Sequence, residues 1–292
     1  MEPTFVSYDV SDPEDIKVET TIVAGTGCSG SKSIFVVADQ TAPYAVYGNY
    51  YYGDAKCSTV FSVDENGTLK EAMQEYIYQT GSAVHGTAIS PNEKYLFSAD
   101  TKGNMLWTHE IDRTTGQLSS IGWVEGPSEN SGPRHIAIHQ SGNYAYIVLE
   151  EASAVAQYSI GDDGTLLRVG NLYSLLPDGL DSADYWADEV SLSAENKYLW
   201  ATNRARGDQK GYISAFELDS TGQISKQLYL QETSTSGGFA NSASGSPFDE
   251  SIAALTDNST GFVEIWDVNN GVIAHLDIRD GQGCCANAVW LD

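Results

Sequence analysis

Basic residues are scarce in this chain, which has 15 Lys and Arg against 40 Asp and Glu, so the positions that they hold are informative. Arg134 and His85 each stand at the start of a predicted strand, and Glu150 and Arg204 stand at the ends of two others. A guanidinium group can bind an anion through paired hydrogen bonds, and an imidazole or a carboxyl group can transfer a proton. These four residues are therefore the candidate functional residues, and the competing interpretation is that each is only a surface hydrogen-bonding group.

Other polar residues are given structural roles. Three histidines fall in predicted outer strands or turns, where a structural or exposed role is expected: His109, His139 and His275. Three aspartates are interpreted as turn or strand-end residues that bond backbone N–H groups: Asp100, Asp188 and Asp257. Arg206 is set aside because it could simply neutralise nearby Asp208.

Motifs for other chemistries are missing from the sequence. It contains no Gly-rich phosphate loop, no metal-binding cluster and no Gly-x-Ser-x-Gly turn. Metal-dependent and serine-nucleophile mechanisms are therefore disfavoured, and no cofactor is expected.

The elements that position the candidates follow a repeat. An apolar strand, a polar turn and a second strand opened by Tyr return about every 50 residues, anchored on Tyr95, Tyr144 and Tyr198. Each copy continues into a third, alternating strand, a turn containing Gly and a fourth strand. A unit of four strands cannot close on itself, so the copies must pack as blades of an all-β propeller.

Five complete blades are predicted, at roughly 31–79, 83–126, 132–176, 187–233 and 237–279. The remaining segments are two N-terminal strands, Thr4–Val10 and Lys17–Val23, and a C-terminal strand, Asn287–Asp292. These ends could share a composite sixth blade, or the chain could lack N-terminal blade material. Residues 1–292 are otherwise expected to form a single propeller domain, in which the innermost strands line a central channel and the candidates converge.

Composition excludes some partners. The formal charge of −25 repels nucleic acid and anionic membranes, so neither is an expected partner. No apolar run is long enough for a transmembrane helix, and the first residues lack the features of a signal peptide. Oligomeric state is left open.

Cysteines and sequons bear on localisation. Two glycosylation sequons, at Asn66 and Asn258, the acidity and four cysteines favour an exported protein, with a cytoplasmic one as the alternative. Cys28 and Cys57 flank strands of one blade and could form a disulfide there, or all four thiols could be free. The adjacent Cys284 and Cys285 are not expected to pair with each other.

Several runs in order resemble the lactonase-type β-propellers and, among them, the fungal 3-carboxy-cis,cis-muconate cyclases. They are Pro43–Gly48, His85-Gly86, Tyr95–Asp100, Leu106–His109, Pro133-Arg134, Gly211–Phe216, Lys226-Gln227, Thr235–Gly238 and Asn287–Trp290. The resemblance extends from about residue 30 to the end. It implies a seven-bladed fold and a site at His85, Arg134, Glu150 and Arg204. One departure is Phe239, which follows Gly237-Gly238 where the family has His.

The resemblance also implies a reaction without a metal. A substrate carboxylate would add across a conjugated double bond to form a lactone, with Arg134 and Arg204 holding carboxylates and His85 and Glu150 sharing the proton transfer. The expected ligand is a small polycarboxylate or a lactone. Two alternatives stay open: a lactone hydrolase of the 6-phosphogluconolactonase type, and a non-enzymatic secreted or cell-surface antigen on the same scaffold.

Overall fold

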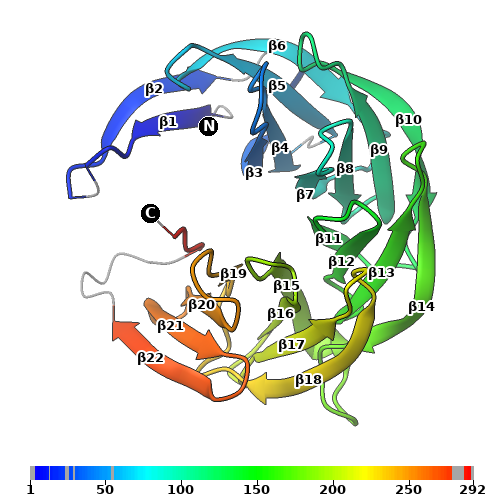
Figure 1. Cartoon of the computed structure of the whole chain (residues 1–292), viewed down its shortest axis with the longest axis vertical. Coiled ribbons are helices and arrows are strands. Elements are labelled where there is room, and N and C mark those ends of the chain that lie inside the picture. The colour runs from blue at the N-terminus through cyan, green and yellow to red at the C-terminus, as the bar shows by residue number, and fades with distance from the viewer. Residues whose placement is uncertain are drawn as a thin grey trace. The chain divides into compact units, whose positions relative to one another are not determined.

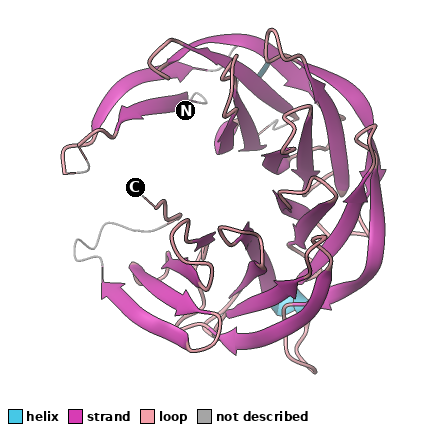
Figure 2. Ribbon diagram, in the orientation of Figure 1, coloured by secondary structure: helices cyan, strands magenta, loops and turns pink. Residues whose placement is uncertain are grey.

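The computed structural model describes residues 4–12, 14–23, 26–28, 30–53, 56–277 and 286–290. Within these ranges the chain forms 22 strands and two single turns of 3-10 helix, η1 (Thr26–Cys28) and η2 (Ser182–Asp184). Figure 2 shows how completely strands dominate. No helix in the described part of the chain is long and apolar enough to cross a membrane.

The strands belong to two compact units. The first comprises residues 1–126 and 163–165, and the second residues 127–162 and 166–292. Each unit is described by itself.

The first unit holds one two-stranded and two four-stranded antiparallel sheets (Figure 1). Its strands are β1 (Thr4–Asp9) and β2 (Lys17–Val23); β3 (Lys32–Ala38), β4 (Val46–Tyr52), β5 (Cys57–Val63) and β6 (Leu69–Ile77); and β7 (Val84–Ile89), β8 (Tyr95–Asp100), β9 (Met105–Ile111) and β10 (Leu118–Glu125).

The second unit holds three four-stranded antiparallel sheets, each a meander of consecutive strands. They are β11 (Pro133–Ile138), β12 (Tyr144–Leu149), β13 (Ala154–Ile160) and β14 (Leu166–Ser174); β15 (Tyr185–Leu192), β16 (Tyr198–Ala205), β17 (Tyr212–Leu218) and β18 (Ile224–Glu232); and β19 (Ala243–Gly245), β20 (Ile252–Asp257), β21 (Phe262–Asp267) and β22 (Gly271–Asp277). The five predicted four-stranded blades are confirmed.

The predicted C-terminal strand is wrong for the residues that the structure describes. Residues 286–290 form no strand. The indole Nε1 of Trp290 donates to the carbonyl of Ser244 at 3.1 Å, and its ring lies against Phe248. The segment is held beside β19 by side chains and not by a ladder of backbone hydrogen bonds, and β1 pairs with β2.

Turns between third and fourth strands also join neighbouring blades. In the turn from β17 to β18, the Asp219 carboxylate accepts the N–H groups of Thr221 and Gln223, and Gly222 takes a φ of +94° that favours glycine. The carbonyl of Gly222 accepts hydrogen bonds from Tyr146 and Gln157 of the preceding blade. This turn therefore fixes the spacing of two blades.

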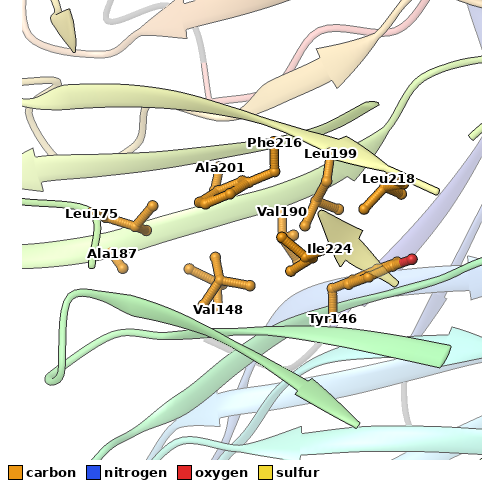
Figure 3. Close-up of a cluster of buried hydrophobic side chains, with 11 residues drawn as sticks. Tyr146, Val148, Leu175, Ala187, Val190, Leu199, Ala201, Phe216, Leu218 and Ile224 are labelled. Atoms are coloured by element: carbon orange, nitrogen blue, oxygen red, sulfur yellow. The ribbon is translucent and has the colours of Figure 1, made fainter. Parts of the chain in front are cut away.

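Apolar side chains fill the space between blades of the second unit. Figure 3 shows a cluster from the β11–β14 and β15–β18 sheets in which Val148, Leu199 and Phe216 are fully buried. At about 25 cal/mol per Å² of apolar surface, burial of this kind supplies most of the stabilisation of the blades. Val190 of β15 belongs to the cluster and Ala137 of β11 packs against it, so the cluster holds the first strands of both blades.

The first unit contains the disulfide that the sequence allowed. Cys28 and Cys57 are bonded, with their Cα atoms 5.9 Å apart, in a core cluster that includes Phe5, Tyr50 and Phe61. The prediction of this bridge is confirmed over the alternative of free thiols. Cys284 and Cys285 lie outside the described residues.

Candidate functional site

The first strands of two neighbouring blades carry β-bulges at the candidate residues. In β11, Pro133 pairs with Leu149 and His135 with Val148, so Arg134 is the surplus residue. In β15, Asp188 and Glu189 together stand opposite Thr202, whose Oγ accepts the N–H of Glu189 at 3.1 Å. A bulge re-aims side chains that a regular strand would send to alternate faces.

The re-aimed Arg134 binds two carboxylates. Its Nε lies 2.8 Å from Oε2 of Glu150, and its Nη1 contacts both the side-chain Oδ1 and the backbone carbonyl of Asp188. Glu150 follows the last residue of β12. Arg134 thus joins the first two strands of its own blade to the first strand of the next.

Arg204, near the end of β16, approaches the same two carboxylates. Its Nη2 lies 3.5 Å from Oε2 of Glu150 and 3.8 Å from Oδ1 of Asp188. Its Nη1 donates to the carbonyl of Phe239, so the residue that departs from the family pattern supports Arg204 through its backbone. The Phe239 side chain is 80% exposed.

These four side chains form a buried charge cluster, defined here as Arg134, Glu150, Asp188 and Arg204. Their exposed fractions run from 3% for Asp188 to 11% for Glu150. Two cations face two anions, so the cluster is neutral when both carboxyl groups are ionised. Burial of charge at this depth is tolerated only where the charges are paired.

The two carboxyl groups have opposite pKa shifts. Burial raises the pKa of Glu150, and the attraction of Arg134 and Arg204 does not overcome that effect. Burial also acts to raise the pKa of Asp188, but the two guanidinium groups and the N–H of Asn241, 2.6 Å from Oδ2, outweigh it and leave the pKa lowered. Such a split suits a site in which one carboxyl group carries a proton and the other stays charged.

A second layer of polar contacts runs beside this cluster. The Nδ1 atom of His135 lies 2.6 Å from Oε1 of Glu189, whose Oε2 accepts a hydrogen bond from Ser242 at 3.1 Å. Arg134 with Asp188, and His135 with Glu189, are consecutive residues on the same two strands. The bulges therefore create two adjacent layers of polar contacts between the blades.

Sequence reasoning missed part of this arrangement. Asp188 does bond a backbone N–H, as expected, but its interpretation as only a turn or strand-end residue is wrong because it is also the shared counter-ion of both arginines. Asp188 stands two residues before Val190, as Arg134 stands two residues before Ile136 in the preceding blade, and this shared position was the available signal.

His85 lies in the first unit, at the bulge of β7 between the Val84–Asp100 and Thr87–Ser98 pairs. It is buried, and its ring meets the edge of Tyr51 with the centroids 5.0 Å apart. The structure brings Arg134, Glu150 and Arg204 together in the second unit, and convergence of His85 with them stays a prediction.

Other expectations have mixed outcomes. Asp100 accepts the N–H groups of Ala83 and Gly103, as expected of a structural residue. Arg206 pairs with Glu151 at 2.5 Å, so its assignment to Asp208 is wrong.

Two further features bear on ligand chemistry. Among the described residues, no group of three or more His, Cys, Asp or Glu side chains could hold a metal ion. An open hollow of about 570 Å³ is lined by Ala152 and by residues in the segment 174–182. None of the four cluster residues lines it, and its polar groups include Asp178 and Asp181 but no cation, so it is not a site for an anionic ligand.

Comparison with known proteins shows the family. Residues 5–273 match the family described as lactonase, 7-bladed beta-propeller. The chain is 35% identical to carboxy-cis,cis-muconate cyclase of Neurospora crassa, over 98% of this chain and 82% of that protein. It is 28% identical to muconate cycloisomerase 1 of Cutaneotrichosporon cutaneum, over 90% of this chain and 74% of that protein.

Solved structures agree on the fold. The periplasmic gluconolactonase PpgL of Pseudomonas aeruginosa superposes with a TM-score of 0.78 at 17% identity, covering 94% of this chain and 77% of that one. The four-stranded sheets are thus propeller blades, and the chain belongs to the lactonase family of seven-bladed β-propellers.

Proposed function

We propose that the chain is an intramolecular lyase that closes 3-carboxy-cis,cis-muconate, or a similar unsaturated polycarboxylate, into a lactone. The observation that carries the proposal is the buried charge cluster, in which two arginines share a carboxyl group of raised pKa. The similarity to a carboxymuconate cyclase gives the substrate class.

The reaction needs anion binding and one proton. An oxygen of one substrate carboxylate forms a C–O bond to the conjugated double bond, and the electron pair moves to the neighbouring carbon, which takes up a proton. The substrate has three carboxylates and the product two, with the third converted to the lactone ester. One proton is therefore consumed in each turnover.

Glu150 is suited to supply that proton. Its raised pKa keeps a larger fraction protonated near neutral pH than an exposed glutamate would have. When Glu150 is protonated, Arg134 and Arg204 face only Asp188, and the cluster gains a net positive charge. Protonation of Glu150 and binding of an anionic substrate would thus favour each other. After turnover, Glu150 would take up a new proton from solvent.

His85 is proposed as a second proton-transfer residue on the family resemblance alone. A general acid and its partner were expected from His85 and Glu150 in either order. The pKa shift of Glu150 supports Glu150 as the acid.

The test follows the ultraviolet absorbance of the conjugated substrate. Purified protein should remove the absorbance of carboxymuconate, with a rate that falls as pH rises past the raised pKa of Glu150. The variant Glu150→Gln should lose at least about a hundredfold in kcat, in the range of general acid catalysis. Arg168→Gln, an exposed change on β14, is the matched control and should leave the rate unchanged.

Other outcomes identify the alternatives. Opening of 6-phosphogluconolactone with proton release, and no loss of muconate absorbance, would overturn the cyclase in favour of a lactone hydrolase. Activity on neither substrate would favour a non-enzymatic role for the scaffold.

A further inference from the structure

We propose that Arg206 recognises an additional carboxylate of the substrate and so sets the preference for a tricarboxylate over a dicarboxylate. This inference rests on the proposed function. It assigns a role to a residue outside the buried charge cluster, one that sequence reasoning had set aside.

Arg206 is placed beside the cluster by the chain and by an aromatic ring. It comes two residues after Arg204, and its backbone N–H donates to the carbonyl of Asp184 at 2.9 Å. The guanidinium carbons of Arg206 and Arg204 lie 4.3 and 5.4 Å from the centroid of the same indole, that of Trp186. Both guanidinium groups therefore lie against the same indole ring.

The two arginines differ in access to solvent. The side chain of Arg204 is 9% exposed, whereas that of Arg206 is 31% exposed. Arg206 is nevertheless fixed, because its Nε donates to the carbonyl of Tyr185 at 3.1 Å and its guanidinium lies over Trp186. Contact with an aromatic face holds a guanidinium group in place. Its N–H donors point outward in the plane of the guanidinium group and stay available for hydrogen bonds.

The counter-ion of Arg206 can be displaced. Glu151 holds Nη2 of Arg206 at 2.5 Å, but its own side chain is 43% exposed. An exposed ion pair contributes little to stability, because water solvates both charges when it separates. A substrate carboxylate can therefore replace Glu151 at Arg206 at small cost, which it cannot do at the buried pair of Arg134 and Asp188.

Glu150 and Glu151 are consecutive, and Arg204 and Arg206 are two residues apart. They form two pairs, a buried one between Arg204 and Glu150 and a more exposed one between Arg206 and Glu151. The buried pair belongs to the proposed proton-transfer chemistry. The outer pair offers a second anion position next to it. A substrate with a third carboxylate can use both, and one that lacks it cannot.

The kinetic test compares two substrates. Arg206→Gln should raise KM for 3-carboxymuconate by roughly tenfold, as expected for loss of one charge-assisted contact, with kcat little changed. KM for muconate, which lacks the third carboxylate, should change less than about twofold. Glu151→Gln should lower KM for the tricarboxylate, because it removes the competing anion. Arg168→Gln should move neither value.

A binding test is independent of turnover. Calorimetry should show that wild-type protein binds tricarballylate more tightly than glutarate, and that Arg206→Gln removes the difference. Equal losses for both ligands, or for both substrates, would show that Arg206 only supports the fold and would overturn the inference. If the wild type turns over neither substrate, the proposed function fails, while the tricarballylate comparison still decides the role of Arg206.

Discussion

Arg134 and Asp188 form a buried ion pair although each is placed by a β-bulge in the first strand of its own blade. A regular strand alternates its side chains between two faces, so neither residue would be aimed by strand geometry alone. The two bulges work together, since each re-aims one charge of this pair toward the other. The contact therefore depends on both blades being correctly folded and spaced.

Asp188→Asn should destabilise the fold by roughly 3–5 kcal/mol at pH 7, because it leaves two buried guanidinium groups with one carboxylate. The lowered pKa of Asp188 gives the effect a pH dependence. The stabilisation is present above the unfolded pKa, near 3.8, and is lost as pH falls through the lower folded value. Urea unfolding at pH 7 and at pH 3 measures the change.

The difference in free energy of unfolding between wild type and Asp188→Asn should be smaller at pH 3 than at pH 7. Asp163→Asn is a matched control, because Asp163 is an exposed turn residue that also has a lowered pKa. A difference of equal size at both pH values would contradict the assignment of Asp188 as the charged counter-ion.

The blades could be predicted from the sequence because the repeat is local. A polar turn followed by Tyr, as at Asn143-Tyr144, and a Gly turn before the fourth strand, as at Gly222, each depend on neighbouring residues only. Arg134, Glu150 and Arg204 could also be selected, because they are charges at strand ends in a regular repeat. Equivalent strand ends of neighbouring blades lie close together, and this predicted that the three side chains would meet in the second unit.

Asp188 shares its repeat position with Arg134, but that position alone does not give its role. The role depends on a bulge in β15 that brings its carboxylate to both arginines, and the sequence does not mark the bulge. The C-terminal strand was predicted wrongly for a related reason. Asn287–Trp290 resembles the innermost strand of a blade, but strand formation requires a partner edge, which a sequence pattern does not supply.

His85→Gln should lower kcat by at least about tenfold with little change in KM, if His85 takes part in proton transfer. The amide keeps a polar group of similar size in the buried position beside Tyr51, so the fold should persist. Steady-state kinetics on carboxymuconate, with circular dichroism as the check on folding, measures this. Tyr51→Phe keeps the ring contact and should retain kcat, and a His85→Gln variant with unaltered kcat would remove His85 from the mechanism.

His109 should make stability depend on pH between about 6.5 and 4. It is fully buried between Tyr76 and Tyr78, and burial lowers its pKa to about 4. The unfolded chain binds a proton near pH 6.5 and the folded chain does not, so stability is present above pH 6.5 and falls on acidification, by at most about 1.4 kcal/mol per pH unit.

His109→Phe removes the titrating group and keeps an aromatic ring. Its free energy of unfolding, relative to wild type, should therefore improve steadily from pH 7 to pH 4.5. His275→Gln is the control, because the His275 side chain is 40% exposed and its pKa is raised by Asp277 and Glu264, so this variant should gain no stability relative to wild type on acidification. Parallel pH profiles for wild type and His109→Phe would show that the buried imidazole takes up its proton in the folded state as readily as in the unfolded chain.

The disulfide between Cys28 and Cys57 should stabilise the first unit by about 3 kcal/mol, because it closes a loop between residues 29 apart in the chain and so restricts the unfolded state. The pair Cys28→Ser and Cys57→Ser removes the bond without leaving a reactive thiol, and its loss should shift the urea midpoint of unfolding downward. Cys284→Ser with Cys285→Ser is the matched control with the same chemical change. Both double variants should stay folded in the absence of urea, so ultraviolet turnover assays under that condition should give both of them the wild-type rate. If the Cys28 and Cys57 double variant has the same urea midpoint as wild type, the disulfide contributes nothing to stability. Thiol titration of denatured wild-type protein then determines whether the disulfide forms at all.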